Sequence, residues 1–281
     1  MPAPSKNKFC DISNWQPSDS TYINAIKSWG AKAVVVKITD GSSWVDKTAE
    51  EKIKNIRNAG MKVHVYHFFK GVSAEDARGE AQHFCRIADK LGIDKQNSIM
   101  VNDVEAPSLT TNAQALTNYC NAFYDEVARL GWKRQDTYSS ASWYQGRIIQ
   151  SQLKANNFWC ASYGAPPEKN FPSVKFNAWQ FSADPQYGNA QYINGTVTDC
   201  NYDYNGFYTV NGGSGGGGGS QPGESKPPAE IKPGGDIMNI DEYIKMLLKD
   251  KTLKKTTLQY CLSILGYIPM NQVLWDKPPW L

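Results

Sequence analysis

Apolar strands alternate with amphipathic helices along residues 8–182, and this alternation constrains the fold more than any other feature. The segment 33–39 is almost continuously apolar, which is typical of a strand buried on both faces. Segments with apolar residues at helical spacing, such as 20–29 and 48–59, lie on either side of it. The alternation predicts parallel strands connected by helices, in either a barrel or a doubly wound sheet.

Helices become scarce toward the end of this region. Strands are expected over 8–14, 33–39, 62–69, 98–105, 136–140, 157–163 and 177–182, and helices over 20–29, 48–59, 73–91, 112–130 and 143–153. Only the last of these helices, a short one, lies among the last three strands. In parallel α/β folds the chemistry takes place at the carboxyl ends of the strands, so functional residues are expected there.

Two carboxylates end the fourth expected strand. Asp103 and Glu105 are separated by one valine, so in a strand both side chains point to the same side. Like charges on one face of a buried strand are costly unless they serve a purpose. Paired carboxylates suit acid catalysis on a glycosidic bond, whereas the alternative is a strand end that caps a helix or pairs with lysines. Because Asp11, His67 and Tyr138 also lie at or near strand ends, the catalytic interpretation is favoured.

Composition argues against several other classes of function. A net charge of +3 is too small to indicate nucleic-acid binding. No stretch approaches the ~20 apolar residues of a transmembrane helix. The three histidines have neither a cysteine cluster nor an HExxH pattern beside them, so no metal is expected. The six cysteines are scattered, which favours reduced thiols over a disulfide framework.

A linker is expected to divide the chain into two parts. Residues 211–235 begin with a Gly/Ser run that cannot pack and continue as a Pro-rich segment. We therefore expect a catalytic domain over 1–210 and a small, mainly helical module over 236–281. About 46 residues is near the lower limit for independent folding, so this module needs a tight core or a partner.

Five motifs resemble those of the family 25 glycoside hydrolases, the Chalaropsis-type lysozymes. They are Asp11-Ile-Ser-Asn-Trp-Gln16, His64-Val-Tyr-His-Phe-Phe69, the segment 75–84, Asp103-Val-Glu105 and Trp179-Gln-Phe-Ser182. The similarity covers about residues 6–208. It implies an α/β fold, an irregular (β/α) barrel with fewer helices than a full eightfold barrel. It also implies cleavage of the β-1,4 bond between N-acetylmuramic acid and N-acetylglucosamine in peptidoglycan, without a cofactor.

The resemblance also implies roles for four carboxylates. Glu105 would be the general acid, which requires a raised pKa. Asp103 would supply a nearby anion that raises this pKa and would orient the acetamido group of the substrate. Asp11 would stabilise positive charge on the sugar ring or assist the attacking group. A fourth acidic residue is expected near the end of the barrel, where Asp199 is favoured and Asp203 is the rival.

Aromatic residues near the strand ends are candidates for stacking on sugar rings, although core packing is the alternative for each. The substrate-binding candidates are Tyr66, Tyr138 and Trp179, with Trp143 and Tyr163 as further groove aromatics. His67 is grouped with them as a hydrogen-bonded support, not as a catalyst.

The whole pattern predicts a bacteriophage-type endolysin, in which a linker tethers a muramidase barrel to a wall-binding module. Its expected partners are bacterial peptidoglycan and other wall polymers, with no nucleic acid and no membrane insertion. The N-terminus shows no apolar signal sequence, so we expect the protein to stay in the host cytoplasm until its release to the wall. Two alternatives stay open: a virion protein whose C-terminal segment serves assembly or oligomerisation, and a silent barrel that only binds glycan.

Overall fold

The computed structural model describes residues 7–155, 157–182, 185–187 and 189–210. The chain divides into two compact units, Met1–Gly217 and Gly218–Leu281, and all described residues belong to the first. The expected linker and the expected C-terminal module lie outside the described residues. Both therefore stay predictions.

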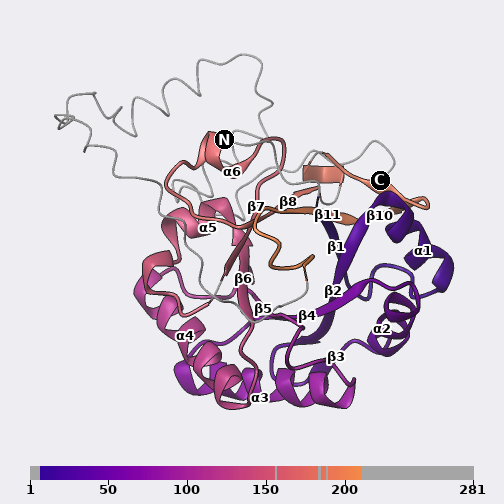
Figure 1. Cartoon of the computed structure of the whole chain (residues 1–281). Coiled ribbons are helices and arrows are strands. Elements are labelled where there is room, and N and C mark those ends of the chain that lie inside the picture. The colour runs from indigo at the N-terminus through magenta and orange to yellow at the C-terminus, as the bar shows by residue number, and fades with distance from the viewer. Residues whose placement is uncertain (1–6, 156, 183–184, 188, 211–281) are drawn as a thin grey trace, which may run out of the picture. The chain divides into compact units, whose positions relative to one another are not determined.

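Within the described residues, eight strands close into a barrel (Figure 1). In order around the barrel they are β1 (Lys8–Ile12), β2 (Ala31–Asp40), β4 (Lys62–Phe68), β5 (Met100–Asp103), β6 (Gln135–Ser140), β7 (Asn157–Ala161), β8 (Ala178–Ser182) and β11 (Asp199–Asp203). Neighbouring strands are parallel, except that β11 runs antiparallel to both β8 and β1. The short β3 (Trp44–Val45) pairs with β2, and β9 (Tyr192–Ile193) pairs with β10 (Thr196–Val197). The expected barrel is confirmed.

Long helices connect the first five barrel strands, and short ones follow. The helices are α1 (Ser20–Trp29), α2 (Ala49–Asn58), α3 (Ala74–Lys90), α4 (Ala113–Arg129), α5 (Ala141–Gly146) and α6 (Pro167–Asn170), with 3-10 turns η1 (Gln150–Gln152) and η2 (Pro185–Tyr187). Side chains that accept backbone N–H bonds cap three of the four long helices: Asp19 at α1, Ser73 at α3 and Asn112 at α4. Figure 1 shows α1–α4 outside the strands. This irregular covering agrees with the expected shortage of helices after residue 136.

Strand β2 shows why the barrel has two separate apolar cores. Its side chains alternate between the two faces of the barrel wall. Ala33 and Val35 belong to the core inside the barrel, whereas Val34, Val36 and Ile38 belong to the core between the barrel and its helices. A strand with both faces buried must be apolar throughout, as the sequence of this segment indicated.

Two differences from the sequence-based expectation concern the site. Strand β5 ends at Asp103, so Glu105 lies in the connection that leads to α4. Strand β11 was not expected, because its sequence Asp-Cys-Asn-Tyr-Asp lacks the apolar residues that normally mark a strand. Its inward residues are polar, and they bond to other polar groups inside the barrel.

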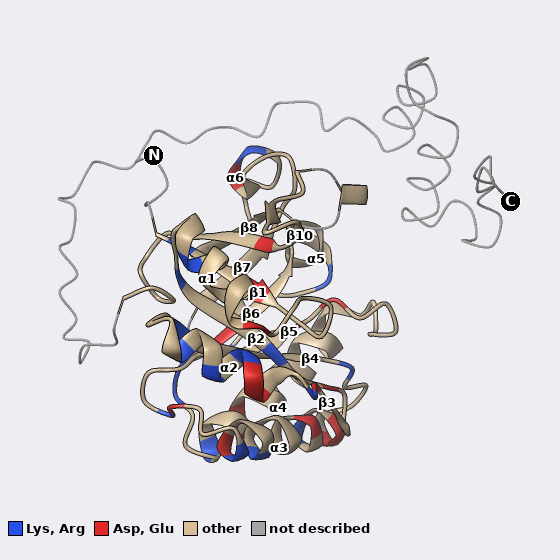
Figure 2. Ribbon diagram, turned by 90° about the vertical axis from the view of Figure 1, so that its right-hand side faces the viewer, with Lys and Arg blue, Asp and Glu red and all other residues tan. Residues whose placement is uncertain are grey.

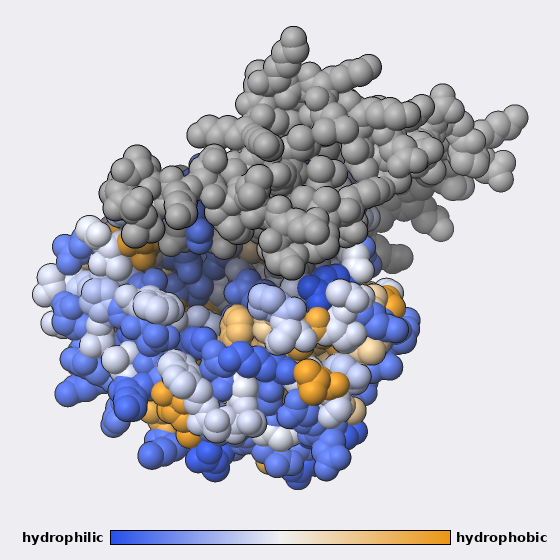
Figure 3. All heavy atoms as spheres, turned by 180° about the vertical axis from the view of Figure 1, so that it is seen from behind, coloured by the Kyte–Doolittle hydropathy of each residue, from blue (hydrophilic) through white to orange (hydrophobic). Residues whose placement is uncertain are grey.

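Helices α2 and α3 carry both basic and acidic residues (Figure 2). On the face shown in Figure 3, most of the described surface is hydrophilic, and hydrophobic residues form small separate patches. None of the helices in the described ranges is long and apolar enough to cross a membrane. The five described cysteines are buried and free, and Cys261 lies outside these ranges.

Candidate active site

Four carboxylates gather at one end of the barrel. Asp11 lies near the end of β1, Asp103 ends β5, and Glu105 lies two residues beyond that end. Because β11 is antiparallel, its first residue, Asp199, lies at the same end and pairs with Asp11 across the two strands. The charges of all four act on Tyr66 of β4, whose pKa is raised by burial and by these carboxylates. The barrel therefore brings together the four carboxylates expected to be catalytic.

Asp11 is held by amide donors from two neighbouring strands. Gln180 donates from Nε2 to both carboxylate oxygens at 3.1 and 3.2 Å, and Asn201 donates from Nδ2 to Oδ1 at 2.8 Å. Trp159 donates in turn to the side-chain oxygen of Asn201 at 2.8 Å, which fixes the amide orientation. Burial raises the pKa of Asp11 to about 6, and the bonds from Asn201 and Gln180 oppose this rise. Asp11 is consequently ionised at neutral pH.

Gln180 is oriented by two tyrosines. The hydroxyl groups of Tyr138 and Tyr163 both donate to its Oε1, at 2.7 and 2.8 Å. With its oxygen occupied by these donors, the amide nitrogen must face Asp11. Tyr138 thus contributes to the site through Gln180, in addition to any contact with substrate.

Glu105 is accessible to solvent at the mouth of the barrel, although protein surrounds much of its side chain. Partial removal from water, and then the charge of Asp11, raise its pKa to about 7, while Lys37 opposes the rise. A carboxyl group with this pKa is protonated in a substantial fraction of molecules at neutral pH. Glu105 therefore has the protonation state that a general acid needs.

Asp103 is buried, and its pKa is raised well above the usual range by burial and then by the charge of Glu105. Within the described residues, its Oδ1 has no hydrogen-bond partner. The expected electrostatic interaction between Asp103 and Glu105 is present, and Asp11 adds a second negative charge that raises the pKa of Glu105. A neutral Asp103 can donate and accept hydrogen bonds, so it can hold a polar group of a substrate.

Lys37 is a cation at the edge of this carboxylate cluster. It lies on the inner face of β2, donates to Asp40 at 3.0 Å, and lies 4.6 Å from the centre of the Phe68 ring. Its charge lowers the pKa values of both Asp103 and Glu105. Lys37 was not among the residues expected at the site, although a single lysine in an otherwise apolar strand is a recognisable feature of the sequence.

Two aromatic residues that were expected to line a substrate groove lie on the outer side of the barrel wall. Strand β8 points Gln180 inward, so its neighbour Trp179 points outward, where it bonds to the Ser162 carbonyl and contacts Tyr202. Trp143 packs on the outer core, under the guanidinium of Arg147. Among the remaining aromatic candidates, Tyr66, Tyr138 and Tyr163 contribute to the inner core.

His67 is fully buried on the outer face of β4. Its Nδ1 bonds to the hydroxyl of Thr39 at 2.9 Å, and its Nε2 bonds to the carboxylate of Glu80 at 2.8 Å. The ring also packs against Phe84 and Phe123. This placement gives His67 no contact with the groove, so the residue supports the barrel wall and is not part of the substrate-binding surface.

The rivals for the fourth carboxylate lie at opposite ends of β11. Asp199 begins the strand beside Asp11. Asp203 ends it at the other end of the barrel and is fully buried. There it accepts five hydrogen bonds from residues 206–209, four from backbone N–H groups and one from a hydroxyl. Asp203 therefore holds a loop, and Asp199 is the candidate for the active site.

Residues 10–190 match the family described as glycosyl hydrolases family 25, over more than half of the chain. The chain belongs to this family. Among relatives, it is 28% identical over 145 residues to the autolytic lysozyme of Clostridium acetobutylicum, covering 52% of this chain and 42% of that protein. It is 25% identical over 188 residues to lysozyme M1 of Streptomyces globisporus, covering 63% and 62%. The chain thus spans less than two thirds of each relative.

A solved structure supports the fold of this family 25 chain. The catalytic domain of the endolysin ply40 from bacteriophage P40 of Listeria monocytogenes superposes with a TM-score of 0.59 at 20% identity. The match covers 74% of this chain and 97% of that domain. At this identity the likeness concerns the fold alone.

The family 25 site contains supporting residues that sequence reasoning did not single out. Gln180 lies within the motif Trp179-Gln-Phe-Ser182, in which Trp179 is the residue whose aromatic ring suits a sugar. Asn201 and the fully buried Lys52 carried no recognisable pattern. Lys52 donates to the Ser13 carbonyl at 2.7 Å, which anchors the loop that follows Asp11. In the described part of the chain, no group of three or more His, Cys, Asp or Glu residues could hold a metal ion.

Proposed function

We propose that this family 25 chain is a muramidase that hydrolyses the β-1,4 bond between N-acetylmuramic acid and N-acetylglucosamine in peptidoglycan. The observation that carries the proposal is the gathering of Asp11, Asp103, Glu105 and Asp199 at one end of the barrel, where burial raises the pKa of Glu105. The pKa of Glu105 is about 7, whereas Asp11 has a pKa of about 6 and is held by amide donors. An acid and an anion at one site are the pair that glycoside hydrolysis requires.

Each carboxylate then has a role that fits its surroundings. Protonated Glu105 donates its proton to the oxygen of the leaving sugar as the glycosidic bond breaks. Ionised Asp11 stabilises the positive charge that develops on the sugar ring. Buried Asp103 binds the acetamido group through its Oδ1, which no described residue engages. Asp199, beside Asp11, adds negative charge on the same side of the site.

We further propose that the protein acts as an endolysin that lyses the host cell from within. Support comes from a relative encoded by a phage, the D-alanyl-L-alanine endopeptidase of Streptococcus phage B30, to which the chain is 28% identical over 187 residues. In this proposal, peptidoglycan is the partner of the barrel and the C-terminal module binds the wall. Detecting the protein in the lysate of infected cells but not in purified virions would support this role, and the reverse would contradict it.

Digestion of purified peptidoglycan tests the enzymatic proposal directly. The intact chain should release new reducing ends on muramic acid, and Glu105→Gln should lower the rate by about 100- to 10,000-fold. Asp89→Asn is a control, because Asp89 is an exposed residue in the last turn of α3, where the chain returns to the other end of the barrel. Near-normal activity of Glu105→Gln would contradict the assignment of Glu105 as the acid. New reducing ends on glucosamine would show that a different glycosidic bond is cleaved.

A further inference from the structure

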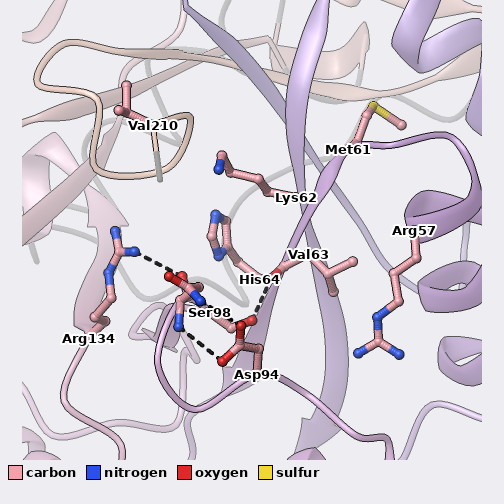
Figure 4. A pocket seen from close by; sticks show the side chains of 10 residues that line it. Arg57, Met61, Lys62, Val63, His64, Asp94, Ser98, Arg134 and Val210 are labelled. Atoms are coloured by element: carbon pink, nitrogen blue, oxygen red, sulfur yellow. Dashed lines mark hydrogen bonds between the residues drawn. The ribbon is translucent and has the colours of Figure 1, made fainter. Parts of the chain in front are cut away.

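A cationic pocket lies at the end of the barrel opposite the carboxylates (Figure 4). Its walls come from the beginnings of parallel strands, whereas the carboxylates lie at the ends of such strands. Lys62 begins β4, and Arg134 immediately precedes β6. The pocket has a volume of about 350 Å³. It is therefore a site separate from the catalytic mouth.

Positive charge predominates among the side chains that line this pocket. Arg57, Lys62 and Arg134 contribute three cations, and Asp94 contributes the one carboxylate. Asp94 is occupied in its own loop, because it accepts hydrogen bonds from the backbone N–H groups of Gln96 and Asn97. The pocket consequently presents a net positive charge to a ligand.

The cations are held in place before any ligand arrives. Arg134 donates to the carbonyls of Asn97 at 2.9 Å and Phe207 at 2.5 Å, and its guanidinium lies 4.9 Å from the centre of the Phe207 ring. Arg57 donates to the Gly92 carbonyl at 2.7 Å. In Figure 4 the Lys62 side chain extends toward the side of the pocket where Arg134 lies. Such preorganisation lowers the entropic cost of binding an anion.

The lining residue His64 adds no charge of its own. His64 is buried, bonds to the Tyr208 carbonyl at 2.8 Å, and accepts the Ile99 backbone N–H at 3.1 Å. Burial lowers the pKa of His64 to about 4, so the ring is neutral at physiological pH. The pKa of Lys62 is also lowered, by burial and by Arg134. Two cations that repel each other at one site would both be stabilised by an anion placed between them.

We propose that this pocket binds a phosphate group through Lys62 and Arg134. A phosphate combines several strong acceptor oxygens with negative charge, which suits a fixed guanidinium and a lysine ammonium on neighbouring walls. The group can be free inorganic phosphate or the phosphodiester of an anionic polymer. The site lies away from the catalytic carboxylates, so it does not depend on the proposed hydrolysis.

Isothermal titration calorimetry on the intact chain tests the proposal with two probes at constant ionic strength. One probe is inorganic phosphate, and the other is poly(glycerol phosphate). Binding of both probes, tighter for the polymer, identifies the polymer as the ligand source. Binding of inorganic phosphate alone identifies the free anion. Absence of binding by both probes overturns the proposal.

Charge variants show whether any binding occurs at this pocket. Lys62→Gln should weaken binding about tenfold, and Lys62→Glu should abolish it, because it places a carboxylate beside the ligand. Lys154→Gln is the matched control: Lys154 pairs with Asp125 on the surface and does not line the pocket. Melting curves without phosphate verify that each variant folds. Unchanged binding in Lys62→Glu, or equal weakening in Lys154→Gln, overturns the proposal because the attraction would then be nonspecific.

Discussion

Asp11 and Asp199 pair directly across the antiparallel strands β1 and β11. This pairing distinguishes the two candidates for the fourth carboxylate, because it places Asp199 beside Asp11, whereas Asp203 lies at the other end of the same strand. We expect Asp199→Asn to lower the rate of peptidoglycan hydrolysis on the order of a hundredfold with an unchanged melting temperature. Asp203→Asn should instead destabilise the fold by about 3 kcal/mol, because an amide nitrogen, which cannot accept, replaces one of the two oxygens that accept buried donors from residues 206–209. Equal effects of both variants on stability would contradict this division.

The protonation of Glu105 predicts the alkaline limb of the pH–rate profile. The general acid must carry its proton, and its pKa is raised to about 7. Activity should therefore fall as the pH rises through about 7, because the acid loses its proton. Initial rates of hydrolysis between about pH 4 and about pH 9 would measure this limb. A rate that stays constant up to about pH 9 would show that Glu105 is not the acid.

Lys37 should determine where that limb lies. Its positive charge opposes the rise of the Glu105 pKa, so removing the charge raises this pKa further. We expect Lys37→Met to move the alkaline limb to higher pH, and Lys37→Arg to leave it close to the wild-type position. A loss of activity in Lys37→Met without a shift of the limb would indicate a role in binding substrate.

Gln180 should control the acidic limb through Asp11. In Gln180→Leu, Asp11 loses the hydrogen bonds that oppose the rise of its pKa, so this pKa should move above about 6. The acidic limb then moves to higher pH, because Asp11 must be ionised to stabilise the sugar cation. Gln114→Leu, which alters an exposed glutamine of α4, is the control. An unmoved acidic limb would show that another group produces it.

Buried carboxyl groups should also make the protein less stable as the pH rises. Burial raises the pKa of Asp11 to about 6 and that of Asp136 to about 7, from a usual value of 3.8. The folded chain therefore binds more protons than the unfolded chain between about pH 4 and about pH 7, and the free energy of unfolding falls over this range. For Asp11 alone the loss is about 3 kcal/mol.

Urea denaturation at about pH 4.5, 6 and 8 measures this dependence. Glu105→Gln should flatten it, because the glutamine side chain does not titrate. Stability below about pH 4 should fall for the opposite reason, since hydrogen bonds with Arg129 lower the pKa of Glu126 to about 2. A free energy of unfolding that rises steadily from about pH 5 to about pH 8 would contradict the raised pKa values.

The sequence by itself determined the alternation of strands and helices and the carboxylates near the strand ends, whereas the barrel was implied by the resemblance to family 25. A strand such as β2, buried on both faces, must be apolar throughout, and amphipathic helices must alternate with such strands to cover them. The sequence also shows the pair formed by Asp103 and Glu105, and the position of Asp11 near the end of β1. These features are local, so a linear pattern records them.

Only the tertiary structure decided which polar residues meet inside the barrel. Strand β11 has no apolar pattern, and its direction can be read only from its pairing, which brings Asp199 to Asp11 and takes Asp203 away. Which face of β8 points into the barrel also depends on packing. Its aromatic residues lie outside and Gln180 lies inside, where Asp11 and two tyrosines satisfy its amide. A hydrogen-bond partner distant in sequence leaves no local pattern, and for that reason the carboxylates could be predicted while the residues that position them could not.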